Sequence, residues 1–431
     1  MIAALIAFAI VLALCFFGIR IGFATLFVGF LGFALERGIG PAFSLMGAQV
    51  LETATSYSLS VIPLFVLMGV FIYRSDISGD LYRAAHARLG HYRGGLAHST
   101  VLACAGFSAV CGSSLATAAT MTRVALPPMR THHYSDRLAT GTIAAGGTLG
   151  IMIPPSVPLM IYGIIAEQDI GRLFIAGILP GAILVLSFMA AIVVWSGLKP
   201  EMAPPGEKLE RKEGASAVRA VLPVLALFVL VLGGIYGRIF TPTEAAGIGA
   251  TGAALIAMTR GHLWSFREWV EALVEASMTT ASLFMVVFGT MVFAQYINLS
   301  GMPFDLMFML QDMQLTPTGL VVGICVIALL LGMVFESLGI LLLLVPVFMP
   351  ALLAAQVDLI WFGIVIVLVT ELGLITPPIG MNVFVVRSVV DDVRMADIFV
   401  GVLPFALAML AVLALILALP GIATWLPGLS G

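Results

Sequence analysis

Apolar segments long enough to enter a lipid bilayer follow one another along almost the whole chain. They lie near residues 2–19, 21–35, 59–73, 97–128, 138–166, 173–198, 218–236, 243–259, 272–297, 318–355, 359–386 and 400–420. A spanning helix needs about 20 apolar residues. Of the 431 residues, 61% are hydrophobic and only 10% are charged, whereas about a quarter are charged in soluble domains. The sequence therefore excludes a soluble globule and predicts an all-α polytopic membrane protein.

Charge, cysteine and motif content exclude several classes of site. Twenty Lys and Arg against 23 Asp and Glu give a net charge of −3, so no basic face exists for nucleic acid. The four cysteines lie in apolar runs without metal-ligand spacing. The sequence contains no HExxH, GxSxG or phosphate-binding loop motif. We expect membrane lipid as a partner, and neither an enzyme nor a cofactor.

The two halves of the chain carry matching motifs, which indicates an internal repeat. At an offset of 223 or 224 residues, the matched pairs are 149–155 with 372–378, Ser114 with Ser337, Pro127 with Pro350, and 177–180 with 401–404. The polar, Pro-rich stretch 199–219 separates the halves and is typical of a solvated linker. We therefore predict repeats at 1–198 and 220–431, joined by this linker.

The distribution of basic residues predicts that the repeats are inverted, because Lys and Arg in short loops stay cytoplasmic. The arm after the third run carries Arg74, Arg83, Arg88 and Arg93, whereas the corresponding 298–315 has no Lys or Arg. If both termini are periplasmic, every Lys and Arg except Arg37, Arg172 and Arg238 lies inside, together with the linker. This holds only if 97–128 and 318–355 each enter and leave on one side.

Those two segments are therefore predicted to be re-entrant hairpins. In the first, the arms on either side of Gly112-Ser113-Ser114 are too short to span. The second turns at 336–339. Backbone that leaves the helix at membrane depth needs polar partners, so we expect a polar ligand at both tips.

Two segments, 138–166 and 359–386, are predicted to be discontinuous helices. Pro154-Pro155 and Pro377-Pro378 interrupt them, since proline removes a backbone donor and clashes with the preceding turn. Such a break frees carbonyls, which suit a cation, and amides, which suit an anion. Oxygens without fixed charge favour Na⁺ as the coupling ion. The candidates for Na⁺ sites are Ser113, Ser114, Gly150, Pro154, Ser337, Gly339, Gly373, Thr376 and Asn382.

Two acidic residues at membrane depth keep H⁺ coupling open as an alternative to Na⁺. For Glu336, a coupling role and a role in capping the hairpin tip are both open. For Glu371, a buried structural contact is the favoured interpretation.

Two other segments receive structural interpretations. Thr243 is expected to cap a helix that has Glu244 in its first turn. Residues 76–89 read as an amphipathic helix at the membrane surface.

Taken together, several motifs resemble the large membrane subunit of TRAP transporters, the DctM-like family. They are 63–69, the 112–114 tip, 149–156, 241–245 and 375–382. The resemblance covers nearly the whole chain and implies a Na⁺-driven importer of organic anions such as C4-dicarboxylates or sugar acids in the bacterial inner membrane. It also implies an elevator mechanism, a periplasmic binding protein and a small four-helix membrane subunit. Because no four-helix stretch precedes the first apolar run, we expect that subunit to be a separate polypeptide.

Substrate selectivity is expected to rest on groups at the tips and breaks. The candidates are Ser113, Ser114, Ser156, Gly380 and Asn382, together with Arg123, for which a headgroup or loop role is the favoured alternative. A stand-alone Na⁺- or H⁺-coupled organic-anion transporter of a related elevator family is the second hypothesis. A channel and an intramembrane enzyme are further alternatives. The sequence does not indicate the cargo, the ion stoichiometry or the oligomeric state.

Overall fold

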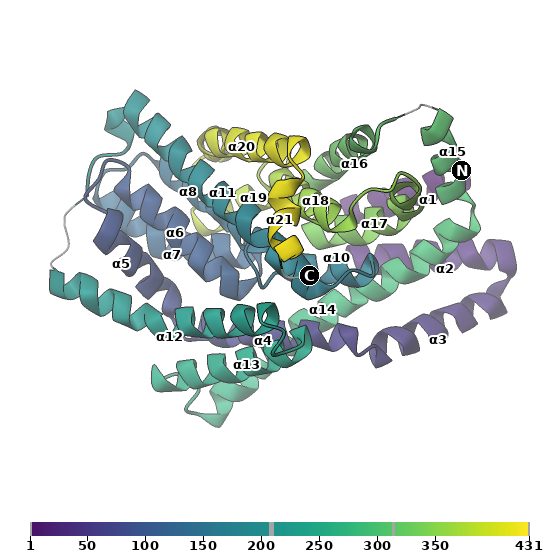
Figure 1. Ribbon diagram of the computed structural model, residues 1–431, viewed down its shortest axis with the longest axis horizontal. Helices are drawn as coiled ribbons and strands as arrows, with labels where there is room; N and C mark the ends of the chain where they lie inside the picture. Colours follow the sequence, from purple (N-terminus) through teal and green to yellow (C-terminus); the bar gives the residue numbers. More distant parts are fainter. Residues whose placement is uncertain (1, 207–210, 313–314, 430–431) are drawn as a thin grey trace.

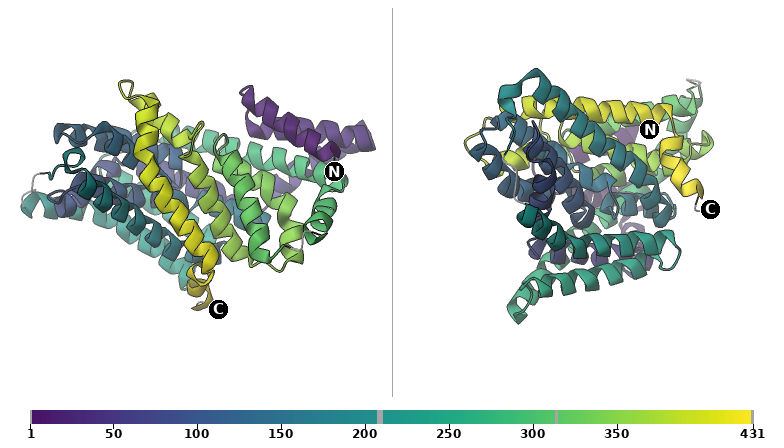
Figure 2. Two further views of the ribbon diagram at one scale, coloured as in Figure 1. Left: turned by 90° about the horizontal axis from the view of Figure 1, so that it is seen from above. Right: turned by 60° about the vertical axis from the view of Figure 1, so that its left-hand side comes forward.

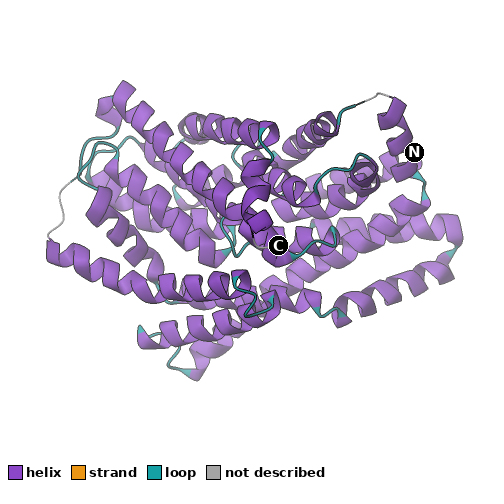
Figure 3. Ribbon diagram, viewed as in Figure 1, coloured by secondary structure: helices purple, strands orange, loops and turns teal. Residues whose placement is uncertain are grey.

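The computed structural model describes residues 2–206, 211–312 and 315–429, and within them every regular element is a helix (Figure 3). The all-α prediction is confirmed. The molecule is elongated, and its N-terminal helices form one edge (Figure 2).

The first half contains the helices that end at the predicted linker. They are α1 (Ile2–Phe16), α2 (Ile21–Arg37), α3 (Ile39–Thr55), η1 (Ser58–Ser60), α4 (Val61–Arg74), α5 (Ile77–Leu89), α6 (Gly95–Cys111), α7 (Ser114–Thr131), α8 (Asp136–Gly147), α9 (Leu149–Met152), α10 (Val157–Ile165) and α11 (Ile170–Leu198).

The second half repeats much of this order. Its helices, with η2 before them, are η2 (Pro200–Met202), α12 (Arg211–Tyr236), α13 (Pro242–Thr259), α14 (Phe266–Leu299), α15 (Met302–Asp312), α16 (Pro317–Gly332), α17 (Ser337–Ala354), α18 (Leu359–Leu374), α19 (Met381–Val389), α20 (Met395–Ala418) and α21 (Gly421–Leu429).

Both predicted hairpins are pairs of packed helices joined by a short turn. α6 and α7 meet at Gly112 and Ser113, and α16 and α17 meet at 333–336. Ser113 and Glu336, which correspond at the 223-residue offset, are the N-cap residues of α7 and α17. The turns thus agree with the repeat, although the second turn ends before Ser337. Entry and exit on one side of the membrane stays a prediction.

Both predicted discontinuous helices are interrupted at their Pro-Pro pairs. α9 ends at Met152 and α10 begins at Val157, with a bend of 41° between the two parts. α18 ends at Leu374 and α19 begins at Met381.

The hairpins and broken helices are interlocked between the two halves. The first hairpin packs against α8 and α9 of its own half, but also against α19 from the second half. Reciprocally, the second hairpin packs against α18 of its own half and against α10 from the first. The two hairpins thus lie on either side of a shared centre (Figure 1). α20 packs on α8 and α11 beside this unit.

A second group of helices packs through close backbone approaches. α2 lies along α14, and α4 lies along α13 and α14. A Cβ on Gly22 would lie 2.7 Å from the Met285 carbonyl oxygen, and a Cβ on Gly29 would lie 2.6 Å from the Phe293 Cα. Small residues let these helices touch without a hydrophobic drive, as in other membrane bundles.

Five helices are long and apolar enough to cross a membrane, namely α11, α12, α14, α17 and α20, and two bent pairs raise the number to seven within the described residues. In α17, 72% of the apolar window is buried inside the protein, against 33–39% in the other four. α17 is therefore an interior arm, as expected of the second hairpin, and the others present more surface to lipid.

The linker predicted at 199–219 is only partly a linker. Residues 207–210 lie outside the described residues, and α12 already begins at Arg211. The part before them is docked: Gly94 N–H donates to the Ala203 carbonyl (3.2 Å), and Ser135 N–H donates to the Met202 carbonyl (3.1 Å). This segment therefore ties the starts of α6 and α8 together instead of being solvated along its length.

Three local expectations change. The cap of α13 is Thr241, not Thr243, and Glu244 completes a capping box with it, because Pro242 occupies the first helical position. α5 packs one face, with Asp80 and Tyr82, against α6 and α12, while contact of its exposed Arg83 and Arg88 with headgroups stays a prediction. α3 is an additional helix, whose sequence is more polar than the apolar runs.

Candidate functional site

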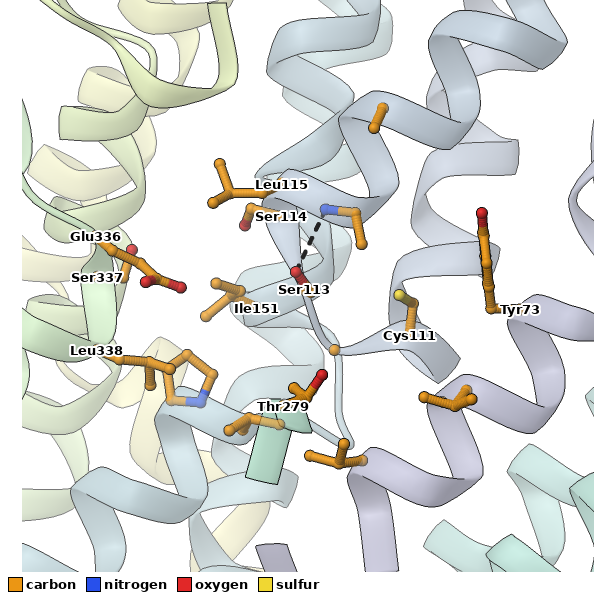
Figure 4. A pocket seen from close by; sticks show the side chains of 18 of the residues that line it. Tyr73, Cys111, Ser113, Ser114, Leu115, Ile151, Thr279, Glu336, Ser337 and Leu338 are labelled. Atoms are coloured by element: carbon orange, nitrogen blue, oxygen red, sulfur yellow. Dashed lines mark hydrogen bonds between the residues drawn. The ribbon is translucent and has the colours of Figure 1, made fainter. Parts of the chain in front are cut away.

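A cavity of about 400 Å³ lies where the two hairpin tips face each other. The first tip contributes Ser113, Ser114 and Leu115, and the second contributes Glu336, Ser337 and Leu338, on opposite sides of the space (Figure 4). α4 and α14 close another side with Tyr73 and Thr279. The cavity is therefore built jointly by both repeats and the helices that pack around them.

The two repeat-related serines share one partner. Ser114 Oγ donates to Glu371 Oε2 and Ser337 Oγ donates to Glu371 Oε1, each at 2.6 Å. Ser114 is 3% exposed, Ser337 1% and Glu371 0%. Glu371 lies near the end of α18, and its carboxyl group thus joins the tips of both hairpins. The structural contact that was favoured for Glu371 is present.

The first tip adjoins an orphaned side-chain oxygen. Asn382, in the first turn of α19, donates from Nδ2 to the Ala144 carbonyl at 3.1 Å. Its Oδ1 is buried without a hydrogen-bond partner among the described residues. Gly147 permits this arrangement, since a Cβ there would lie 2.9 Å from the Ser114 carbonyl oxygen and 3.0 Å from Asn382 Nδ2. The lack of a side chain on Gly147 therefore lets the first hairpin tip and the Asn382 side chain approach each other.

The second tip adjoins the second break. Gly380, with φ +58°, caps α19 and donates its N–H to the Met333 carbonyl at 3.3 Å. The Thr376 hydroxyl donates to the Leu372 carbonyl at 2.6 Å, which leaves its lone pairs free to accept. Gly373 touches Gly332, because a Cβ on Gly373 would lie 2.5 Å from the Gly332 Cα. Gly373 thus serves close helix packing here.

Four other predicted residues do not line the cavity. Gly150 packs its backbone against Ser108, and a Cβ on Gly339 would lie 2.7 Å from Ile21 Cδ1. Pro154 is buried in the first break. The Ser156 hydroxyl, 0% exposed, accepts from Leu159 N–H at 3.3 Å and caps α10. Asn382 and Gly380 also lie behind the tips and not on the cavity wall.

Three acidic or basic side chains line the cavity among the described residues. Glu275 is paired with Arg74, whose Nη2 lies 2.9 Å from its Oε2. Arg123, on α7, is exposed and forms no ion pair with the described residues, and Glu336 is also exposed. Arg123 therefore supplies a positive charge at the site, although a lipid headgroup was the favoured partner from the sequence.

Sequence reasoning missed the contributions of α4 and α14 to this wall. Glu275 and Thr279 lie in a long apolar helix whose residues match neither hairpin motif. Their spacing of four residues on one helical face was the available signal.

Basic residues assigned to one side of the membrane come together in the structure. Arg130 pairs with Asp136 and Asp392, at 2.8 and 3.0 Å, between the loops that follow α7 and α19. The hydrogen bond from Arg130 lowers the pKa of Asp392. Arg172 and Arg238, both assigned to the opposite side, line another common cavity. Which side of the membrane each group faces stays a prediction.

Among the residues that the structure describes, no group of three or more His, Cys, Asp or Glu side chains could hold a metal ion.

The chain is similar to known transporters over nearly all its length. It is 33% identical over 386 residues to the C4-dicarboxylate TRAP transporter large permease protein DctM of Pseudomonas aeruginosa, covering 90% of each chain. It is 33% identical to the sialic acid TRAP transporter large permease protein SiaM of Vibrio cholerae, covering 97% of each. Its fold resembles the crystal structure of the Alcanivorax borkumensis YdaH transporter, with a TM-score of 0.65 at 14% identity, over 88% of each chain.

Residues 1–422 match the family described as the DctM component of the tripartite ATP-independent periplasmic transporter. Transport, not catalysis, is the activity named for the two similar permeases. With its multi-pass helical fold and its paired hairpins, the chain belongs to the DctM family of TRAP transporter large permeases.

Proposed function

We propose that this chain is the large membrane subunit of a Na⁺-driven importer of organic anions, with carboxylates such as C4-dicarboxylates or sugar acids as cargo. The observation that carries the proposal is the single cavity to which both hairpin tips and Arg123 contribute. A guanidinium group suits a carboxylate because it can donate two parallel hydrogen bonds. The Ser113 hydroxyl accepts from Ala116 N–H and keeps its own proton, so it adds a donor for the rest of the anion.

The charge balance of the cavity supports cation coupling. An anionic substrate beside Arg123 also lies in the space that Glu336 faces. Arg74 is already paired with Glu275, so it does not offset the added charge. A bound Na⁺ would compensate for the charge that the substrate brings, which makes substrate binding favourable only with the ion present.

The orphaned Asn382 Oδ1 supports one proposed Na⁺ site, beside the first hairpin tip. Hard cations prefer oxygen ligands, and a buried oxygen without a partner is costly unless an ion or water meets it. At the second break, Thr376 and the carbonyls freed beside it are the corresponding candidates. Na⁺ at these positions would hold tips and breaks together around the substrate.

The interlocked hairpins and broken helices are the proposed moving unit, and the group formed by α2, α4, α13 and α14 is the proposed scaffold. Alternating access then follows from sliding one against the other. The periplasmic binding protein would deliver the anion to the outer face. A small four-helix subunit would contact the scaffold, and both termini would be periplasmic in the bacterial inner membrane.

Uptake into proteoliposomes tests the proposal. The chain, its small subunit and the binding protein are reconstituted, and labelled C4-dicarboxylate and sialic acid are supplied with or without an inward Na⁺ gradient. We expect accumulation only with the gradient and the binding protein. Uptake without the binding protein would instead favour the stand-alone transporter, and flux that needs no gradient would favour a channel.

Arg123 variants test the anion site in the same assay. Arg123→Gln should raise the half-saturating substrate concentration at least tenfold, since a charge-assisted bond is lost. Arg123→Lys should raise it less. Arg93→Gln, outside the cavity, is the control. Equal KM values for all variants would contradict a role for Arg123.

A further inference from the structure

The side chain of Glu371 accepts a hydrogen bond from the tip of each hairpin. Ser114 and Ser337 donate to different oxygens of its carboxyl group, both at 2.6 Å. The two serines are 223 residues apart and belong to opposite repeats. One carboxyl group therefore holds both serines.

The first repeat contains no equivalent of this carboxyl bridge, by which we mean Glu371 and its hydrogen bonds to Ser114 and Ser337. The residue that corresponds to Glu371 in the first repeat is Thr148, whose hydroxyl donates to the Ala145 carbonyl within its own helix. One acceptor thus serves two donors, and removing it would leave both tips without their shared anchor. Both serines line the cavity, and Gly147 lies between the Ser114 backbone and Asn382.

We propose that Glu371 is a positioning residue that holds the two hairpin tips in register, so that a change at one tip is transmitted to the other. The effect on transport rests on the proposed function, whereas the mechanical linkage does not. A ligand that orders one tip would reduce the entropy lost when the other becomes ordered, which produces positive cooperativity between ligands.

The first test measures the linkage without transport. Hydrogen exchange is followed by mass spectrometry on the full chain in nanodiscs, with peptides that cover 110–118 and 333–341. Ser337→Ala, the smallest perturbation, should increase exchange at the first tip about tenfold, because one hydrogen bond to the shared carboxyl group is lost. Ser114→Ala should do the same at the second tip.

Variants of Glu371 separate positioning from charge. Glu371→Gln should behave almost like the wild type, because its amide accepts from one serine hydroxyl and donates to the other. Glu371→Ala should increase exchange at both tips, and adding Ser337→Ala should then have little further effect. Thr370→Val is the matched control, because the buried Thr370 hydroxyl bonds only within its helix.

Two results would overturn the proposal. Exchange that changes only at the substituted tip would show that the tips are independent. A Glu371→Gln variant that matches Glu371→Ala would assign the effect to charge instead of hydrogen bonding.

Transport then tests the consequence. Glu371→Ala, which removes no candidate Na⁺ ligand, should raise the Na⁺ concentration for half-maximal uptake several-fold, whereas Glu371→Gln should change it much less. Unchanged Na⁺ dependence with altered exchange would contradict the coupling role. If the wild type itself transports without Na⁺, the proposed function fails while the exchange result still decides the linkage.

Discussion

The centres of the two repeats have matching backbones but different chemistry. Both have a hairpin tip with a serine and a helix broken at Pro-Pro. At the corresponding central position, however, the first repeat has Thr148, which bonds within its own helix, and the second has Glu371, which bonds both tips. Two similar backbones thus form one site because a single side chain in the second repeat bonds the tips of both.

The largest difference expected between the halves is their orientation. We predict that cysteine introduced at Tyr92, at the base of the first hairpin, is labelled only from the cytoplasm. Cysteine at Leu315, at the base of the second, should be labelled only from the periplasm. Membrane-impermeant maleimide on cells and on inverted vesicles, in a background without Cys15, Cys104, Cys111 and Cys325, gives the answer. Labelling of both bases from one side would refute the inversion.

We expect the next largest effect when the carboxyl group found at Glu371 is introduced at the corresponding Thr148 of the first repeat. Thr148→Glu places a carboxyl group in a fully buried position whose local partner is a carbonyl acceptor. Removal of one partner of a buried charge destabilises proteins by about 3–5 kcal/mol, and we expect a comparable loss of stability. The yield and melting temperature of detergent-solubilised protein measure it, with Thr148→Ser as the control. Wild-type stability of Thr148→Glu would show that the first centre tolerates the same charge.

The glycines beside the centres sharpen the comparison. A Cβ on Gly150 would lie 2.2 Å from Ser108 Cβ, whereas a Cβ on Gly373 would meet the Gly332 backbone at 2.5 Å. Overpacking costs about 1–3 kcal/mol, so both alanine variants should lower the melting temperature. Ser108→Gly should partly restore Gly150→Ala, because it removes the opposing side chain. No comparable second substitution exists for Gly373→Ala, because the added methyl group would meet the backbone of Gly332. If Ser108→Gly does not restore stability to Gly150→Ala, the distinction between the two glycines is contradicted.

The smallest effect is expected at the exposed ion pair between the repeats. Because Arg130 lowers the pKa of Asp392, the pair contributes stability above the ordinary Asp pKa and loses it as pH falls through the lowered value. Asp392→Asn should thus slightly lower the melting temperature at pH 7 and have no effect at strongly acidic pH. High salt should reduce the difference. If Asp392→Asn lowers the melting temperature more at acidic pH than at pH 7, the pair does not stabilise the protein through the charge of Asp392.

The sequence predicted the elements of the site better than its contacts. The correspondence of Ser114 with Ser337, and the breaks at both Pro-Pro pairs, followed from the repeat and from the backbone chemistry of proline. The bridge through Glu371 did not, because side chains 257 residues apart along the chain meet only after the repeats interlock. The contact between Asn382 and the first half was hidden for the same reason.

The predictions for three individual helices were also incomplete, each for a physical reason. Thr241 and Thr243 both resemble a helix cap, and the choice depends on which backbone N–H faces the hydroxyl. α3 escaped notice because Gln49 and Glu52 interrupt its apolar pattern, although they bond each other. α5 has the pattern of a surface helix, yet Asp80 is buried with Arg260 as a partner, which no pattern within α5 reveals.

By itself, the sequence determined that this chain is a polytopic helical protein with two related halves, because hydrophobicity, proline and glycine act within a few residues. Only the tertiary structure decided that α10 and α19 each pack against the hairpin of the other half, and that both halves surround one cavity with Glu371 between the tips. Local rules set where helices begin, break and end, whereas the partner of a buried polar group depends on which distant segment reaches it.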